Sequence, residues 1–291
     1  MVSPPHALVI PYPAQGHVIP LLEVAHALAD RGFTVTFVNT EFNHARVVAA
    51  GAGLEDGGRI RFVAVPDGMA PGEDRNQLVR LTMLMEEFMA PRVEELVLAS
   101  GEGGGAGGKI TCMVTDYNVG SWALQVARRT GIRSAAVWPA STAVMATLLS
   151  FNKLIEDKII DPEDVDYDIG ARNNRVLAHP AVACFVSHCG WNSTMEGVRN
   201  GVPFIAWPYF ADQFVNQVYI SDVWKIGLKA VADKSGVITK EHIAGLLAEL
   251  KGDAGMRERV EALKKAAHES IQSGGSSHGN FDTFAEGMKK A

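Results

Sequence analysis

The chain has 291 residues, which is enough for two domains. Apolar residues make up 47% and charged residues 21%, as in a soluble globular protein. The net charge is −6 without a basic block, which argues against nucleic acid as a partner. Three cysteines are too few for a disulfide framework and odd in number, so a reducing compartment and a cytoplasmic location are expected.

Neither a signal peptide nor a membrane span is expected. The N-terminal stretch has no basic region, and prolines interrupt its apolar run. The longest apolar stretch, Ala135–Phe151, contains proline, serine and threonine and is shorter than a membrane-spanning helix. It predicts a buried strand followed by a helix.

Strand-like and helix-like segments alternate through the first half of the chain. Apolar, β-branched runs predict strands at 6–12, 33–39, 59–66, 109–116 and 132–138. Helical spacing predicts helices at 17–32, 41–51, 75–100, 119–131 and 141–157. Pro91 should kink or break the third helix, and the glycine-rich stretch 101–108 resembles a linker more than a phosphate loop. This alternation predicts a doubly wound parallel sheet.

The second half of the chain contains fewer strands. Strands are predicted at 181–188, at 203–208 and near 228–231, and helices at 193–201, 211–227, 239–252, 254–272 and near the C-terminus. Two or three strands are too few for an independent doubly wound domain, which usually has about 5–6. The polar stretch 156–174 between the halves is typical of a domain linker.

The stretch SHCGWNSTMEG, residues 187–197, joins a predicted strand to a helix and carries an unusual set of polar side chains. At the carboxyl edge of a parallel sheet, a helix N-terminus offers free N–H groups to a phosphate. Gly190 would allow close approach, and His188, Asn192 and Ser193 would add donors. The alternative is a capping box formed by Ser193 and Glu196, and both interpretations can hold together.

Two other ligand classes fit this chain less well. His179, Cys184, His188 and Cys189 lie close together in the sequence, but no paired CxxC exists, which disfavours zinc. A nucleotide-dependent dehydrogenase needs a glycine-rich turn after the first strand, and YPAQGH has one glycine.

Residues 175–213 and the N-terminal stretch PYPAQGHVIPLLEVAHAL, residues 11–28, resemble the plant UDP-dependent glycosyltransferases of small molecules. The resemblance implies a GT-B fold of two Rossmann-like doubly wound domains. The N-terminal domain would bind a small-molecule acceptor, and the C-terminal domain the UDP-sugar. It also implies an inverting transfer of glucose from UDP-glucose to a hydroxyl of a plant secondary metabolite, without metal or cofactor, by a monomer.

The resemblance assigns roles to individual residues. His17 matches the general base that takes the proton of the acceptor hydroxyl, and Asp116 matches the acid that orients it. Both residues follow predicted strands at the carboxyl edge, so they can meet. The UDP-sugar set comprises His188, Gly190, Trp191, Asn192, Ser193, Glu196, Asp212 and Gln213. Among these, Gln213 is the type associated with glucose rather than galactose.

The sequence departs from the family pattern just before the C-terminal box. Gly170 stands where the family has the tryptophan that stacks on uracil, and Asn173 stands in place of a glutamine. We infer that an internal segment is absent, with its junction within 161–174. The expected domains are therefore an incomplete acceptor domain at 1–160, the junction at 161–174 and an incomplete UDP-sugar domain at 175–291. The alternative to an active enzyme is a truncated chain, inactive or unstable, that retains at most residual nucleotide binding.

The stretch VPDGMAPGEDRNQ, residues 65–77, is a candidate for the acceptor wall, although a plain surface loop is the preferred interpretation.

Overall fold

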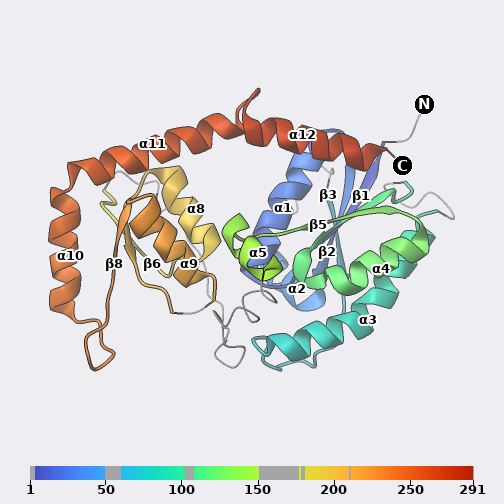
Figure 1. Ribbon diagram of the computed structural model, residues 1–291. Coiled ribbons are helices and arrows are strands. Elements are labelled where there is room, and N and C mark those ends of the chain that lie inside the picture. Colours follow the sequence, from blue (N-terminus) through green and yellow to red (C-terminus); the bar gives the residue numbers. More distant parts are fainter. Residues whose placement is uncertain are drawn as a thin grey trace. The chain divides into compact units, whose positions relative to one another are not determined.

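The computed structural model describes residues 4–49, 60–101, 108–150, 177, 181–209 and 211–290 (Figure 1). The chain divides into two compact units. Unit 1 consists of Met1–Pro139 together with Phe281–Ala291, and unit 2 of Ala140–Asn280. The predicted junction at 161–174, with Gly170 and Asn173, lies outside the described residues.

Unit 1 is built on a parallel sheet, as the alternation of segments predicts. Its five strands are ordered β3-β2-β1-β4-β5, and every neighbouring pair is parallel. The strands are β1 (His6–Ile10), β2 (Thr34–Thr40), β3 (Ile60–Val65), β4 (Cys112–Asp116) and β5 (Arg133–Val137). The chain reverses its direction of winding at β1, so β1 and β4 form the switch point where such sheets bind ligands.

Helices cover both faces of this sheet, which explains why the residues of β1 and β4 are buried throughout. The helices are α1 (Gln15–Ala29), α2 (Glu41–Ala49), α3 (Leu78–Ala99), α4 (Gly120–Thr130) and α12 (Ser276–Lys289), with a 3-10 turn, η1 (Tyr117–Val119). Leu8 and Ile10 pack with α3 and α4, whereas Ala7 and Val9 pack with α1 and α12. Of the two alternatives at Pro91, the break is wrong, because α3 is a single helix with Pro91 inside it, and the kink stays a prediction.

The C-terminal helix belongs partly to unit 1. The sequence-based boundary places residues 175–291 in one domain, but the structure assigns Phe281–Ala291 to unit 1. Ala285 and Met288 are buried in the same apolar cluster as residues of α1, on the face of the sheet that α1 covers. Arg31 forms an ion pair with Asp282 at 2.6 Å. Because these apolar residues lie on one side of α12, the helix covers part of the sheet that α1 leaves open.

Unit 2 contains a smaller parallel sheet. Its described strands, β6 (Phe185–Ser187), β7 (Phe204–Ala206) and β8 (Gly227–Lys229), lie in the order β6-β7-β8. Phe204 and Ala206 face α8 and α11, and Ile205 faces α10. The helices are α5 (Thr142–Leu149), α8 (Trp191–Asn200), α9 (Gln213–Val218), which continues as a π turn, η3 (Tyr219–Val223), and α10 (Lys240–Gly252) and α11 (Ala254–Ile271).

A glycine allows α8 to pack closely on β7. A Cβ atom at Gly197 would lie 2.1 Å from Cζ of Phe204, so any larger residue would push the helix away from the strand. This contact holds the N-terminus of α8 at the carboxyl end of β6.

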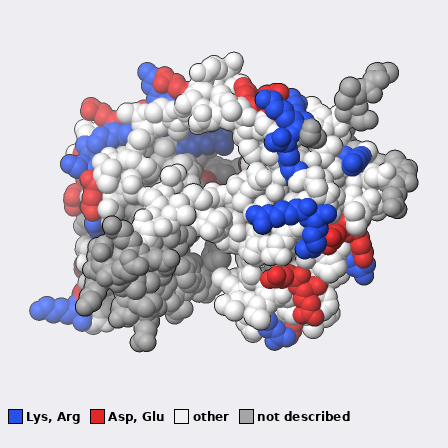
Figure 2. Space-filling view, turned by 45° about the vertical axis from the view of Figure 1, so that its right-hand side comes forward, with Lys and Arg blue, Asp and Glu red and all other residues white. Residues whose placement is uncertain are grey.

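Charged side chains of both signs lie beside one another on the face shown in Figure 2, where much of the surface is neutral. Within the described ranges, no helix is long and apolar enough to cross a membrane.

Candidate functional site

His17 and Asp116 meet at the switch point of unit 1. Asp116 is the last residue of β4, and His17 lies in the first turn of α1, which follows β1. Nδ1 of His17 lies 2.8 Å from Oδ2 of Asp116, and the carboxylate is fully buried while the imidazole is 20% exposed. The contact that the sequence predicts is therefore present.

The buried carboxylate selects the tautomer of His17. An ionised carboxylate only accepts hydrogen bonds, so Nδ1 of His17 carries the proton and donates it to Oδ2. The other oxygen, Oδ1, accepts the backbone N–H of Asn118 at 2.8 Å. With its proton on Nδ1, an imidazole has its lone pair on Nε2, which is the arrangement of a base oriented by an acid.

Tyr12 packs against the same imidazole, a contact that sequence reasoning missed. The two ring centroids are 5.4 Å apart in an edge-to-face arrangement. The hydroxyl of Tyr12 lies 3.4 Å from Oγ1 of Thr82 on α3. Burial raises the pKa of Tyr12, and the carboxylate of Asp116 adds to the shift, so this phenol stays protonated at neutral pH. The sequence signal for this contact was the position of Tyr12 at the end of the first predicted strand, shortly before His17.

In unit 2, α8 presents an uncapped N-terminus. Its N-cap is Gly190, which has no side chain to accept the first N–H groups, and the first helical bond runs from the N–H of Thr194 to the carbonyl of Gly190. The predicted capping box is wrong, because Ser193 is the third residue of the helix and not its cap. A helix N-terminus is a place where backbone N–H groups can point at an anion.

His188 lies over this helix end. A Cβ atom at Gly190 would lie 2.4 Å from Nε2 of His188, so only glycine leaves the imidazole in that place. Burial lowers the pKa of His188, against an opposing effect of Asp212, so the ring is neutral near pH 7 and donates one N–H. Cys189, between His188 and Gly190, has a positive φ of 64°. Burial raises the pKa of its thiol to about 12, so this cysteine is not a nucleophile.

Asn216 joins the loop after β6 to the start of α9. This fully buried amide donates to the carbonyl of Cys189 at 2.9 Å and to Oδ2 of Asp212 at 2.8 Å. Gln213 is also buried, and its Oε1 accepts the backbone N–H of Tyr209 at 3.0 Å. Sequence reasoning named Asp212 and Gln213 but missed Asn216, whose only signal was its position one helical turn after Asp212.

The remaining predicted residues occupy the first two turns of α8. Ser193 and Glu196 are buried, whereas Trp191 and Asn192 are half-buried. The ring of Trp191 lies 6.5 Å from that of Trp224. The predicted UDP-sugar residues thus lie in two clusters of unit 2, one on the β6–α8 turn and one at the start of α9, which Asn216 connects.

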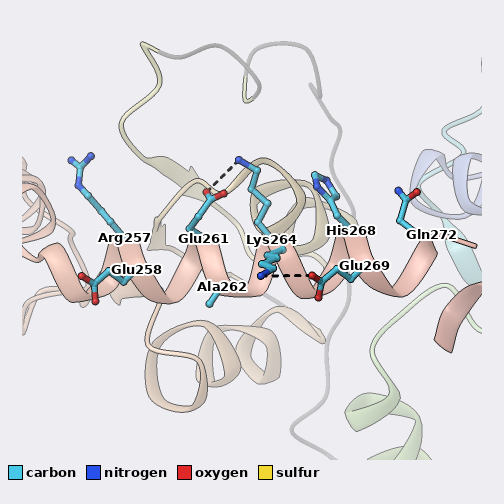
Figure 3. Close-up of a pocket in the computed structure, with 9 residues that line it drawn as sticks. Arg257, Glu258, Glu261, Ala262, Lys264, His268, Glu269 and Gln272 are labelled. Atoms are coloured by element: carbon cyan, nitrogen blue, oxygen red, sulfur yellow. Dashed lines mark hydrogen bonds and ion pairs between the residues drawn. The ribbon is translucent and has the colours of Figure 1, made fainter. Parts of the chain in front are cut away.

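A separate hollow follows the surface of α11 and contains none of the predicted site residues (Figure 3). Its lining comes from α11 and the adjoining Gln272 and is mostly charged, with ion pairs between Glu261 and Lys264 and between Lys265 and Glu269. It has no chemistry that points to a ligand. Among the described residues, no group of His, Cys, Asp and Glu could hold a metal ion.

The two parallel-sheet units, with the His17–Asp116 pair in one and the N-terminus of α8 in the other, match what the predicted GT-B fold implies. Residues 171–273 match the family model "UDP-glucoronosyl and UDP-glucosyl transferase". UDP-glycosyltransferase 83A1 of Arabidopsis thaliana is 28% identical over 450 residues, covering 98% of this chain and 97% of the relative. Linamarin synthase 1 of Manihot esculenta is 24% identical over 476 residues, covering 97% of this chain and 96% of the relative. The family-model match and these full-length relatives support the predicted resemblance to the plant UDP-glycosyltransferases.

Solved structures show the same fold. Os79 of Oryza sativa, crystallised with UDP, superimposes with a TM-score of 0.80 and 21% identity, over 97% of this chain and 100% of that one. UGT89C1 of Arabidopsis thaliana, crystallised with quercetin, gives a TM-score of 0.78 and 19% identity, over 98% and 100%. These structures confirm the predicted GT-B fold.

The chain is shorter than its relatives at internal positions. The alignment with UDP-glycosyltransferase 83A1 runs over 450 positions, whereas the chain has 291 residues. The difference, 450 minus 291, leaves at least 159 positions of the relative without a counterpart here.

Proposed function

We propose that the chain transfers glucose from UDP-glucose to a hydroxyl of a small molecule, with inversion at the anomeric carbon. The observation that carries this proposal is the contact between His17 and Asp116, with Nδ1 of the imidazole bonded to a fully buried carboxylate. Nε2 of His17 takes the proton of the acceptor hydroxyl, the acceptor oxygen attacks the anomeric carbon, and the bond to UDP breaks. No metal or cofactor takes part in this proposal.

Unit 2 supplies donors for the leaving group. The uncapped N-terminus of α8 and the imidazole of His188 would face the diphosphate, where they stabilise the charge that develops on UDP. Asp212 would bind sugar hydroxyls, with Asn216 holding its carboxylate in place. Gln213 would do the same through its amide nitrogen, because Oε1 is engaged by Tyr209.

The ligands of the related structures support this choice of substrates. Os79 was crystallised with UDP and UGT89C1 with quercetin, a hydroxylated small molecule. The three cysteines of this chain are free thiols, which supports a reducing cytoplasmic location.

A second candidate is a truncated, inactive chain that retains nucleotide binding. It is favoured by the positions missing from the alignment and by a second sheet with three described strands, where an independent domain has about 5–6. Gly170 gives no stacking surface for a uracil base.

The experiment that separates the two candidates is thermal unfolding of the purified chain with and without millimolar UDP-glucose, followed by an assay of UDP release. We expect a cooperative transition that rises by several degrees with the nucleotide sugar, and UDP release that depends on a phenolic acceptor. A shift without acceptor-dependent release favours the nucleotide-binding remnant. A broad transition that does not shift contradicts the active enzyme and favours the unstable form of the truncated chain.

Replacing Gly190 by alanine should weaken UDP binding at least about tenfold, because displacing His188 removes one hydrogen bond to a charged group. The backbone at Gly190, with φ −56° and ψ 145°, suits alanine, so the fold should survive. Isothermal titration with UDP measures the effect. Gly245→Ala on α10 is the matched control, since its Cβ would meet no atom within 4 Å. Equal UDP affinities in the two variants would argue against a diphosphate site here.

A further inference from the structure

A buried ion pair holds together the segment between β3 and α3, residues 66–77, called here the β3–α3 segment. The guanidinium of Arg75 donates from Nε to Oδ2 of Asp67 at 2.8 Å and from Nη2 to Oδ1 at 3.2 Å. The side chain of Asp67 is 5% exposed and that of Arg75 16%. A two-pronged contact of this kind fixes both side chains in one geometry.

The ion pair also organises the backbone of the segment. Oδ1 of Asp67 accepts the N–H of Met69 at 3.0 Å, and Arg75 donates to the carbonyls of Met69 and Glu73. Ala70 donates its N–H to the carboxylate of Glu73 at 2.8 Å. A buried ion pair adds little stability compared with an apolar contact of the same size, but loss of one partner is strongly unfavourable. The pair therefore specifies a conformation of the segment.

The β3–α3 segment contacts the start of α2 and, through α2, the loop that leads to His17, the proposed base. The guanidinium of Arg75 lies 4.2 Å from the ring centre of Phe42 at the start of α2. The next residue, Asn43, donates to the carbonyl of Pro13 at 2.8 Å, in the loop that leads to His17. Met69 belongs to the same buried cluster as Tyr12, whose ring packs on His17. The loops at the carboxyl ends of β1, β2 and β3 are thus linked.

We propose that the Asp67–Arg75 pair is a positioning device that locks the β3–α3 segment as a preformed wall of the acceptor site. The inference rests on the proposed function, because an acceptor must reach Nε2 of His17 at this edge of the sheet. A preformed wall lowers the ordering cost of binding, so the pair should act on acceptor affinity and leave UDP affinity unchanged. This favours the acceptor wall over the plain surface loop, the interpretation that the sequence alone preferred.

The first test measures hydrogen exchange of peptides covering residues 66–77, without any ligand. Asp67→Asn should speed their exchange by roughly tenfold or more, and Arg75→Lys, which keeps the charge but loses the fork, should give a smaller increase. The matched control is Arg80→Gln, which breaks the more exposed Glu73–Arg80 pair and should change exchange by less than about twofold. Equal exchange rates of these peptides in Asp67→Asn and Arg80→Gln would show that the Asp67–Arg75 pair does not hold the segment in place.

The second test measures binding of quercetin by quenching of tryptophan fluorescence and binding of UDP by titration. Asp67→Asn should weaken quercetin binding about fivefold or more and change UDP affinity by less than about twofold. Equal quercetin affinities in Asp67→Asn and Arg80→Gln would overturn the wall, as would a parallel loss of UDP affinity. A wild-type chain that binds UDP but no quercetin would contradict both the acceptor wall and the proposed acceptor. The hydrogen-exchange result tests only whether the Asp67–Arg75 pair holds the β3–α3 segment in one conformation.

Discussion

Replacement of His17 by alanine is expected to lower the rate constant of glucose transfer by roughly 10²–10⁴-fold. The substitution removes Nε2, the lone pair that would take the acceptor proton, while Asp116 keeps its bond from the N–H of Asn118. The residues proposed to bind the UDP-sugar lie in unit 2, so the affinity for UDP-glucose should change by less than about twofold. UDP release at saturating acceptor measures the rate, and titration with UDP-glucose measures the affinity.

The control for this variant is His26→Ala, a second histidine on α1 that has no place in the proposed mechanism. It should retain nearly the full rate, so a comparable loss in both variants would point to damage of α1 and not to a missing base. Transfer that continues at the wild-type rate in His17→Ala would exclude His17 as the base. A wild-type chain with no transfer at all would favour the nucleotide-binding remnant.

Much of unit 1 could be predicted from the sequence because its signals are local. Each apolar run of seven or eight residues overlaps an observed strand of five to seven, such as His6–Ile10 and Thr34–Thr40, and each following segment with helical spacing overlaps a helix. The contact of His17 with Asp116 followed from a topological rule, since both residues lie at the carboxyl ends of strands that pair as neighbours.

The features that sequence reasoning missed depend on contacts between distant residues. Nothing local indicates that Phe281–Ala291 returns to unit 1, because α12 has the same periodicity wherever its apolar side packs. The start of α8 at Trp191 was missed because Ser193 and Glu196 match a capping box, whereas the N-cap is Gly190, which packs closely against His188. Asn216 depends in the same way on a carbonyl 27 residues away.

Replacement of Asp116 by asparagine is expected to lower the rate of transfer by roughly 10²–10⁴-fold through the tautomer of His17. The N–H of Asn118 can only donate, so it holds the carbonyl oxygen of the new amide and turns the NH₂ group toward Nδ1 of His17. Nδ1 must then accept, which moves the imidazole proton to Nε2 and removes the base. Nitrogen NMR of labelled histidine should show this change of tautomer without any substrate. Asn118→Ala keeps the backbone N–H and should keep both the native tautomer and the rate; an unchanged tautomer in Asp116→Asn would refute this role of the carboxylate.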